Sequence, residues 1–184
     1  MTTKGVVTLA DQLEEPVYER LASYVGFEVR RYAPSIEARV KTAGPGGNSS
    51  SAGFRRIAGY IFGGNKEGRS IAMTAPVQQW GEGEGGWMSF TMPSSFSLTS
   101  LPEPVDSGVL LLACEQRDVA VLPFSGRYHQ KKCARLNERL DELVREAGLI
   151  PLAEPILAVY DGPMTLPFRR RNEILLPVKW PPEQ

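Results

Sequence analysis

Hydrophobic and polar side chains alternate in several short runs of this chain, which is the pattern of strands that bury one face. In the clearest run, 69–77, every second residue from Ile71 to Val77 is apolar. Residues 16–24 leave two alternatives open, an edge strand and a short turn. The same pattern predicts further strands at 27–32, 36–40, 87–92, 109–113, 119–124, 156–160 and 173–178.

Two connections between these strands have turn-like sequences. Residues 33–35 contain Pro34 and predict a tight turn that pairs strand 27–32 with strand 36–40. The Gly-rich run 81–86 predicts a turn into the strand at 87–92.

A first helix is predicted from a period of 3.6 residues. Apolar residues recur at positions i, i+3, i+4 and i+7, namely Phe54, Ile57, Ala58 and Ile61. This spacing indicates an amphipathic helix of about 12 residues. We expect Asn48 or one of the serines 49–51 to cap its start, and Gly63 with Gly64 to end it.

A second helix is predicted at 131–147. Its apolar stripe consists of Leu136, Leu140, Leu143, Val144 and Ala147. Asp141 and Arg145 are four residues apart and can pair along the helix. Gly148 is the expected C-cap.

The order strand, helix, strand, strand occurs twice, at about 16–94 and 107–179, although the residues scarcely match. The Gly/Ser-rich residues 41–51 form a surface loop and not a linker, because too little precedes them to fold alone. We therefore predict one α+β domain over residues 1–184, with a joined, curved, mostly antiparallel sheet and two helices packed on it.

Composition and charge exclude several classes of protein. The chain is 42% hydrophobic, which supplies a core, and its 21 Lys and Arg balance 21 Asp and Glu. A net charge of zero argues against a nucleic-acid partner, because phosphate binding needs a basic field. No apolar run approaches the roughly 20 residues of a membrane span. The run 6–10 is shorter than the roughly 7 residues of a signal core, so we expect a cytoplasmic protein.

Residues for common enzyme chemistry are sparse. Cys114 and Cys133 provide no disulfide framework and no metal-ligand spacing. His129 is the only histidine, so any Ser-His-Asp or Cys-His site would have to use it. We expect His129 to be an exposed residue at the start of the second helix. The Gly-rich run 81–86 contains two glutamates that would repel phosphate.

Seven short motifs follow one another along nearly the whole chain. They lie at 27–32, 53–56 leading into 60–65, 71–77, 88–93, 119–126, 160–164 and 170–174. Each is weak alone, but in this order they resemble the SOUL / haem-binding protein family. The resemblance covers roughly residues 24–178.

The resemblance implies a distorted β-barrel flanked by two helices and built from a pseudo-two-fold βαββ repeat, similar to the GyrI-like effector-binding fold. It also implies non-covalent binding of haem or another tetrapyrrole in a shallow groove beside the first helix. A histidine that some members carry before that helix is absent here. The positions closest to the family's suggested propionate partners, Ser51, Gly59 and Thr165, are not basic.

Residues of the first helix can supply such a groove. Arg55 and Arg56 can pair with the carboxylates of a porphyrin, and Arg169 or Arg170 can substitute for them. The alternative for these arginines is a solvated helix face. The candidate apolar wall consists of Phe54, Ile57, Ala58, Ile61, Phe62, Met73, Met164, Leu166 and Phe168. The alternative for the wall is ordinary core packing, because a helix stripe usually faces the sheet.

Three classes of function remain. The first is a non-catalytic haem- or tetrapyrrole-binding protein, with no metal ligand assigned. The second is a GyrI-like small-ligand or protein-interaction module in which haem binding is incidental. The third is an enzyme that uses Glu173, Tyr60 or Tyr160 as acid or base. For Glu173 we predict instead a structural ion pair with an arginine inside the barrel, because a buried carboxylate needs a partner.

Overall fold

The computed structural model describes residues 13–45, 47–81 and 85–182. Its helices are α1 (Gly47–Ile61), α2 (Gln130–Glu146) and the short 3-10 helix η3 (Pro167–Arg169). Its strands are β1 (Tyr18–Tyr24), β2 (Phe27–Tyr32), β3 (Ser35–Thr42), β4 (Val77–Trp80), β5 (Gly86–Thr91), β6 (Leu110–Cys114), β7 (Arg117–Ser125), β8 (Ile150–Pro151), β9 (Ile156–Val159) and β10 (Arg171–Lys179).

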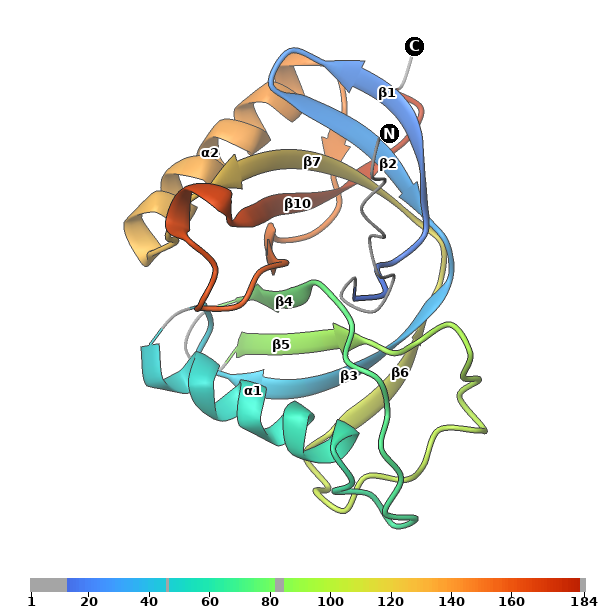
Figure 1. The fold of residues 1–184 in the computed structure, drawn as a ribbon. Coiled ribbons are helices and arrows are strands. Elements are labelled where there is room, and N and C mark those ends of the chain that lie inside the picture. Colours follow the sequence, from blue (N-terminus) through green and yellow to red (C-terminus); the bar gives the residue numbers. More distant parts are fainter. Residues whose placement is uncertain (1–12, 46, 82–84, 183–184) are drawn as a thin grey trace, which may run out of the picture.

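The strands form one sheet in the order β1-β2-β7-β10-β9-β4-β5-β3-β6, and β8 pairs with β10 (Figure 1). All of these strand pairings are antiparallel. The path of paired strands ends at β1 and at β6, so the curved sheet stays open within the described residues. The predicted α+β class is confirmed, and the barrel is a distorted, unclosed one.

The sheet order reads as two βαββ units joined edge to edge. One unit is β3-α1-β4-β5, the other is β7-α2-β9-β10, and β4 pairs with β9 where they meet. The strands before each unit cross over: β2 runs into β3 but pairs with β7, and β6 runs into β7 but pairs with β3. This order accords with the predicted repeat, while a single domain over residues 1–184 stays a prediction.

The predicted hairpin at 33–35 is wrong. β2 pairs with β1 and β7, whereas β3 pairs with β5 and β6. Pro34 favours an extended conformation in the residue before it, and the Ala33 N–H donates to the carbonyl of Val17. The chain therefore continues from one half of the sheet to the other. Residues 16–24 were left open between strand and turn, and Tyr18–Tyr24 of this segment form the edge strand β1.

The predicted strand at 69–77 is also wrong, because regular pairing starts only at β4. The hydrogen bonds of this segment go to scattered partners and not to one neighbouring strand. The Ile71 N–H donates to Ile61, the Ala75 N–H donates to Glu14, and the Thr74 hydroxyl donates to the carbonyl of Thr91. Ile71 is nevertheless buried. The alternation therefore indicates a segment with one buried face, but the segment is not hydrogen-bonded as a strand of the sheet.

Both predicted helices are present, and their starts differ from expectation. α1 begins at Gly47, so the proposed capping residues 48–51 lie inside it and do not precede it. α2 begins one residue earlier than predicted, and the Nδ1 atom of His129 accepts a hydrogen bond from the Lys132 N–H as N-cap. Gly148 follows α2 with φ of 74°, a conformation that glycine adopts readily at helix ends. Residues 82–84 of the turn predicted at 81–86 lie outside the described residues, and Gly86 already belongs to β5.

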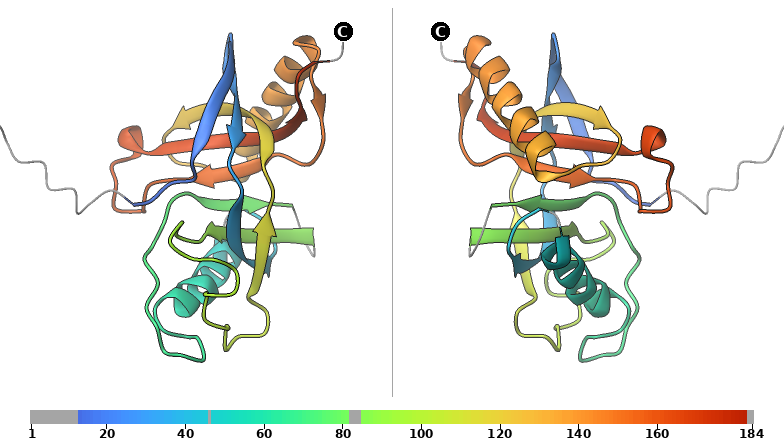
Figure 2. Two further views of the ribbon diagram at one scale, coloured as in Figure 1. Left: turned by 90° about the vertical axis from the view of Figure 1, so that its right-hand side faces the viewer. Right: turned by 90° about the vertical axis from the view of Figure 1, so that its left-hand side faces the viewer.

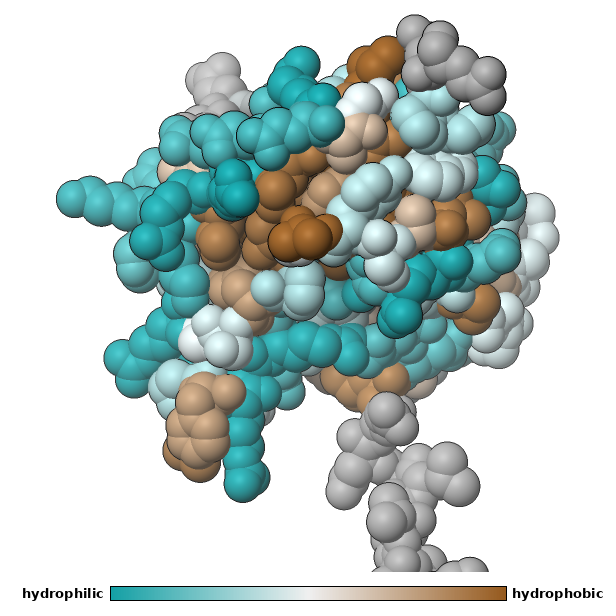
Figure 3. All heavy atoms as spheres, turned by 90° about the horizontal axis from the view of Figure 1, so that it is seen from above, coloured by the Kyte–Doolittle hydropathy of each residue, from teal (hydrophilic) through white to brown (hydrophobic). Residues whose placement is uncertain are grey.

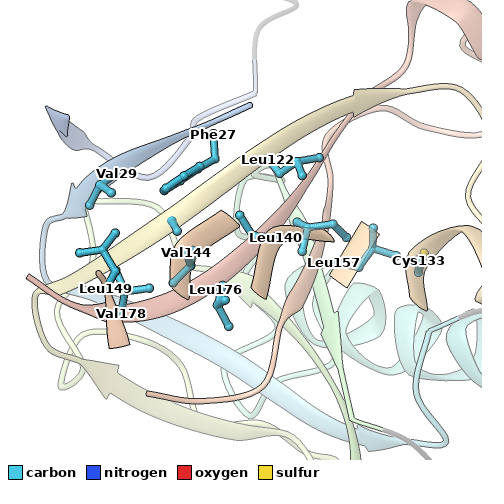
Figure 4. Packing of buried hydrophobic residues seen from close by; sticks show 12 residues of the cluster. Phe27, Val29, Leu122, Cys133, Leu140, Val144, Leu149, Leu157, Leu176 and Val178 are labelled. Carbon is cyan, nitrogen blue, oxygen red and sulfur yellow. The ribbon is translucent and has the colours of Figure 1, made fainter. Parts of the chain in front are cut away.

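Each helix covers its own half of the sheet (Figure 2). α2 packs on β7, β8 and β10, and α1 packs on β3 and β5. Under α2, Leu140 and Val144 point toward Phe27, Leu176 and their neighbours (Figure 4). Under α1, the core includes Val40, Met88 and Phe90 in addition to the helix residues. None of the helices in the described part of the chain is long and apolar enough to span a bilayer.

Candidate functional site

The apolar stripe that predicts α1 faces the sheet. Ile57, Ala58 and Ile61 are 0%, 9% and 1% exposed, and Ile57 and Ile61 pack in the core beside Met88. Met73 is half-buried against the same core. These four of the predicted site residues therefore lie behind the surface of α1 and not on it.

A different stripe of α1 faces solvent, formed by Arg55, Gly59 and Phe62. Spacings of four and three residues place them on one side of the helix. Phe62, just past the last turn, is 68% exposed. A Cβ added at Gly59 would meet no atom within 4 Å, so the helix backbone is uncovered there. We call these three residues the α1 stripe.

Arg55 supplies the positive charge of the α1 stripe. Its Nε donates to the carbonyl of Ser51 at 3.3 Å, and its guanidinium pairs with no carboxylate among the described residues. Phe54 lies beside the stripe, 40% exposed, and its ring tilts against Phe90 at a centroid distance of 5.3 Å. The stripe thus combines an uncovered backbone, an exposed ring and a cation.

Arg56 has a different role from Arg55. Its Nε and a terminal nitrogen donate to the two carboxylate oxygens of Asp106 at 2.7 and 2.8 Å. The Arg56 hydrogen bonds, followed by that of the Gly108 N–H, lower the pKa of Asp106 to about 2. Arg56 therefore ties the loop before β6 to α1 and is already occupied by a carboxylate.

Met164 and Phe168 lie on another surface, together with Leu166. They are 94%, 71% and 54% exposed. Figures 1 and 2 show η3 at the level of β10 and β7, whereas α1 lies beyond β5, in the other half of the sheet. The structure thus divides the predicted apolar wall into a core group, the α1 stripe with Phe54, and this separate group.

Sequence reasoning missed a cavity of about 730 Å³. It lies between the residues leading into β1, the β2–β3 link, the end of β5 and the β6–β7 link. Its apolar lining includes Ile36, Met92 and Phe96, and its carboxylates are Glu14, Glu15 and Glu115. No lysine or arginine of the described chain lines it, so its charge opposes a ligand with carboxylates. Five segments that are distant in the sequence build it, and no local sequence pattern reveals such a site.

A shallower hollow of about 480 Å³ lies between the β1–β2 turn and α2. Tyr24, Phe27 and Leu143 line it, and the adjacent Val25 is 93% exposed. Figure 3 looks down on this end of the molecule and shows hydrophobic atoms gathered between hydrophilic margins.

Glu173 forms the predicted ion pair, and Arg30 is the partner. The carboxylate oxygens accept from two guanidinium nitrogens of Arg30 at 3.0 and 3.1 Å, and from the Tyr160 hydroxyl at 2.6 Å. Arg30 and Glu173 are 7% and 3% exposed. Burial, and then the Glu173 carboxylate, raise the pKa of Tyr160 well above its ordinary value. The Tyr160 hydroxyl therefore stays protonated and is the donor of its hydrogen bond to Glu173.

The other candidate acid–base and ligand residues are also held in place. The Tyr60 hydroxyl is buried and donates to the carbonyl of Pro102 at 2.9 Å. His129 is exposed, as predicted, and caps α2. No group of three or more His, Cys, Asp or Glu side chains suited to a metal ion occurs in the ranges 13–45, 47–81 and 85–182.

Comparison with known proteins identifies sequence relatives. The family model described as SOUL heme-binding protein matches residues 13–177. Human Heme-binding protein 2 is 28% identical over 159 residues, which represent 82% of this chain and 77% of that protein.

Solved structures share the fold at low identity. The C-terminal domain of EcmrR has a TM-score of 0.64 and 13% identity, over 89% of this chain and 98% of that one. A hydrolase from Listeria innocua has a TM-score of 0.58 and 12% identity, over 86% of this chain and 94% of that one. These neighbours have the GyrI-like fold that was expected, and at such identities they show the fold alone.

Proposed function

The chain belongs to the SOUL heme-binding protein family, and from this premise we propose that it binds haem or a related tetrapyrrole without a covalent bond and without catalysis. The site we propose is the α1 stripe with Phe54 at its edge. The observation that carries the proposal is the uncovered backbone at Gly59 between Arg55 and Phe62. A flat macrocycle can lie directly against the helix there, because Gly59 has no side chain that would keep it at a distance.

The residues of the α1 stripe fit the chemistry of a porphyrin. The exposed ring of Phe62 offers a face for stacking. Arg55 offers guanidinium donors for a propionate, and no carboxylate of the described residues competes for them. The acidic cavity near Glu14 and Glu115 lacks such a cation. We therefore prefer the α1 stripe although it is the less enclosed of the two places.

Apolar contact would supply most of the affinity. Burying roughly 400 Å² of porphyrin surface contributes on the order of 10 kcal/mol before association costs. The α1 stripe contains no histidine, cysteine or methionine, so the proposed binding does not depend on a ligand to iron. Met164 and Phe168 are left out of the site because they lie on the separate surface near η3.

The absence of catalysis is part of the proposal. Both carboxylate oxygens of Glu173 are engaged by Arg30 and Tyr160, and the Tyr60 hydroxyl is buried in a bond to Pro102. None of the three is free to move a proton to a ligand on α1. Incubation with haem followed by product analysis tests this point, and a new pigment formed in proportion to protein would contradict it. A cytoplasmic location and the lack of a nucleic-acid partner remain further parts of the proposal.

The test of binding is a pair of spectroscopic titrations, one with haem and one with iron-free protoporphyrin. We expect a saturable Soret shift with haem at micromolar concentrations and similar affinity for both compounds, because no iron ligand contributes. A haem titration without saturable shift would rule out the proposed function. Much tighter binding of haem than of protoporphyrin would show iron ligation and refute the proposed mode.

A second candidate function is a GyrI-like binding module in which haem is incidental. The acidic cavity of about 730 Å³ favours it, since ligand pockets commonly have volumes of about 300–1,000 Å³. If this alternative holds, a partner captured by the protein is retained equally with and without haem, and the α1 stripe variants do not affect its capture.

A further inference from the structure

Positive charge is concentrated in two segments of this chain, whose overall net charge is zero. Residues 119–137 contain four Lys or Arg and no Asp or Glu, and residues 162–172 contain three Arg and no Asp or Glu. Together they hold seven of the 21 basic residues of the chain. The net charge of the whole chain is zero, but these two segments are locally basic.

The fold brings these two segments together at one end of the sheet. Arg171 at the start of β10 is paired with Ser125 at the end of β7. The amide Nδ2 of Asn172 donates to the carbonyl of Gly126 at 3.0 Å. The short helix η3 contacts β7, and Figure 1 shows η3 and the start of α2 on the same side of the molecule.

Some of these basic side chains serve the structure, while others point to solvent. Arg170 binds the carbonyls of Pro163 and Thr165 within its own loop. Arg171 pairs with Glu15 and lies over the ring of Tyr160. In contrast, the exposed side chains of Arg127, Lys131 and Arg169 pair with no carboxylate in the part of the chain that the structure describes.

Apolar side chains project from the same place. Met164, Leu166 and Phe168 are 94%, 54% and 71% exposed. The loop that carries them is fixed by hydrogen bonds from the Arg170 side chain, from the Thr165 N–H to Gly162 and from the Arg169 N–H to Leu166. A constrained loop that presents three large apolar side chains next to unpaired cations is typical of a binding surface.

We propose that this surface, defined by Met164, Leu166 and Phe168 with Arg127, Lys131 and Arg169, docks on the anionic headgroups of a lipid membrane. The apolar side chains would enter the boundary between headgroups and acyl chains, and the cations would lie among the lipid phosphates. A nucleic acid would satisfy the cations but would leave exposed Met164 and Leu166 without partners. The surface is separate from the α1 stripe, so the proposal is independent of haem binding.

The test is sedimentation of the full chain with vesicles of phosphatidylcholine mixed with phosphatidylserine, and with vesicles of phosphatidylcholine alone. We expect saturable binding to the anionic vesicles that weakens as salt is added. Replacing both Met164→Ser and Phe168→Ser should weaken binding at least about tenfold. Lys131→Glu should weaken it about fivefold or more.

Two matched variants control for exposure and charge. Val25→Ser replaces another residue that is 93% exposed, and Lys66→Glu makes the same charge change in the loop after α1. Both should bind vesicles like the unmodified chain.

Three results would overturn the proposal. The first is a lack of binding to the anionic vesicles. The second is vesicle binding that the Met164→Ser, Phe168→Ser double variant retains in full. The third is tight binding of an RNA or DNA duplex that depends on Lys131 but not on Phe168, which would make the surface a nucleic-acid site. Haem titrations of these variants should match that of the unmodified chain, so failure of this proposal is distinguishable from failure of the proposed function.

Discussion

The helices α1 and α2 occupy equivalent positions in the two βαββ units, yet their outer faces differ. The outer face of α2 is charged, and beyond its first turn it carries two ion pairs along the helix, Arg145 with Asp141 and Arg139 with Glu142. The outer face of α1 carries Gly59, Phe62 and an arginine that no described carboxylate pairs with. Both helices bury an apolar stripe against the sheet.

This difference suggests a division of roles. Charged side chains are well solvated in water, whereas a glycine inside a helix weakens it and an exposed ring such as Phe62 adds little to the core. We infer that the outer face of α2 needs no small-molecule ligand, whereas the outer face of α1 has kept a surface for one. Three variants test the division, and they follow from the largest expected effect to the smallest.

The largest effect is expected from Arg30→Met, which leaves the Glu173 carboxylate buried with only the Tyr160 hydroxyl as partner. Breaking one side of a buried pair costs about 3–5 kcal/mol in the free energy of unfolding. Urea unfolding measures this loss, while the haem affinity of the folded protein should stay unchanged. Arg30→Met combined with Glu173→Leu should recover part of the loss. A cost below about 1 kcal/mol would show that the pair is not structural.

A smaller effect, dependent on pH, is expected from Asp106→Asn. Because Arg56 holds the folded pKa of Asp106 at about 2, below the ordinary 3.8, the carboxylate stabilises the fold above about pH 4 and loses this contribution as the pH falls through about 2. The pair is partly exposed, so we expect about 0.5–1 kcal/mol at neutral pH. Unfolding midpoints should differ between the two proteins at neutral pH and converge in acid. A difference that is constant with pH would contradict the assignment.

The smallest effect is expected from Asp141→Ala on α2. The pair with Arg145 is exposed, and the entropy of holding two long side chains offsets most of its attraction. The unfolding midpoint should fall only slightly, and haem affinity should be unaltered. A clear loss of haem binding would contradict the division of roles between the helices.

Local periodicity predicted most of the elements but not how they pair. The alternation at 27–32 and the 3.6-residue period at 131–147 located β2 and α2 closely. The same patterns predict which face of a strand is buried, but they do not predict which strand lies beside it. For this reason the link at 33–35 was wrongly predicted to be a hairpin turn. At 69–77 the alternation was real, but the hydrogen bonds of Ile71, Thr74 and Ala75 go to three different segments.

The candidate site was less predictable for a physical reason. The spacing of Ile57 and Ile61 predicts α1 because these residues face the sheet, and for the same reason they cannot line a surface groove. The pairing of Arg56 with Asp106 joins residues 50 positions apart, which no local pattern contains. Gly59 was recognisable as unusual within a helix, but only the structure shows that nothing covers it.

The most direct test of the account is a haem titration of Gly59→Leu beside Gly162→Leu, since an added Cβ meets no atom within 4 Å at either position. Leucine should stabilise α1 by about 0.5–1 kcal/mol, so that any loss of binding is not due to unfolding. We predict that Gly59→Leu weakens haem binding at least about tenfold, or about 1.4 kcal/mol, while Gly162→Leu binds like the unmodified chain. Equal haem affinity in all three proteins would contradict a binding site on α1.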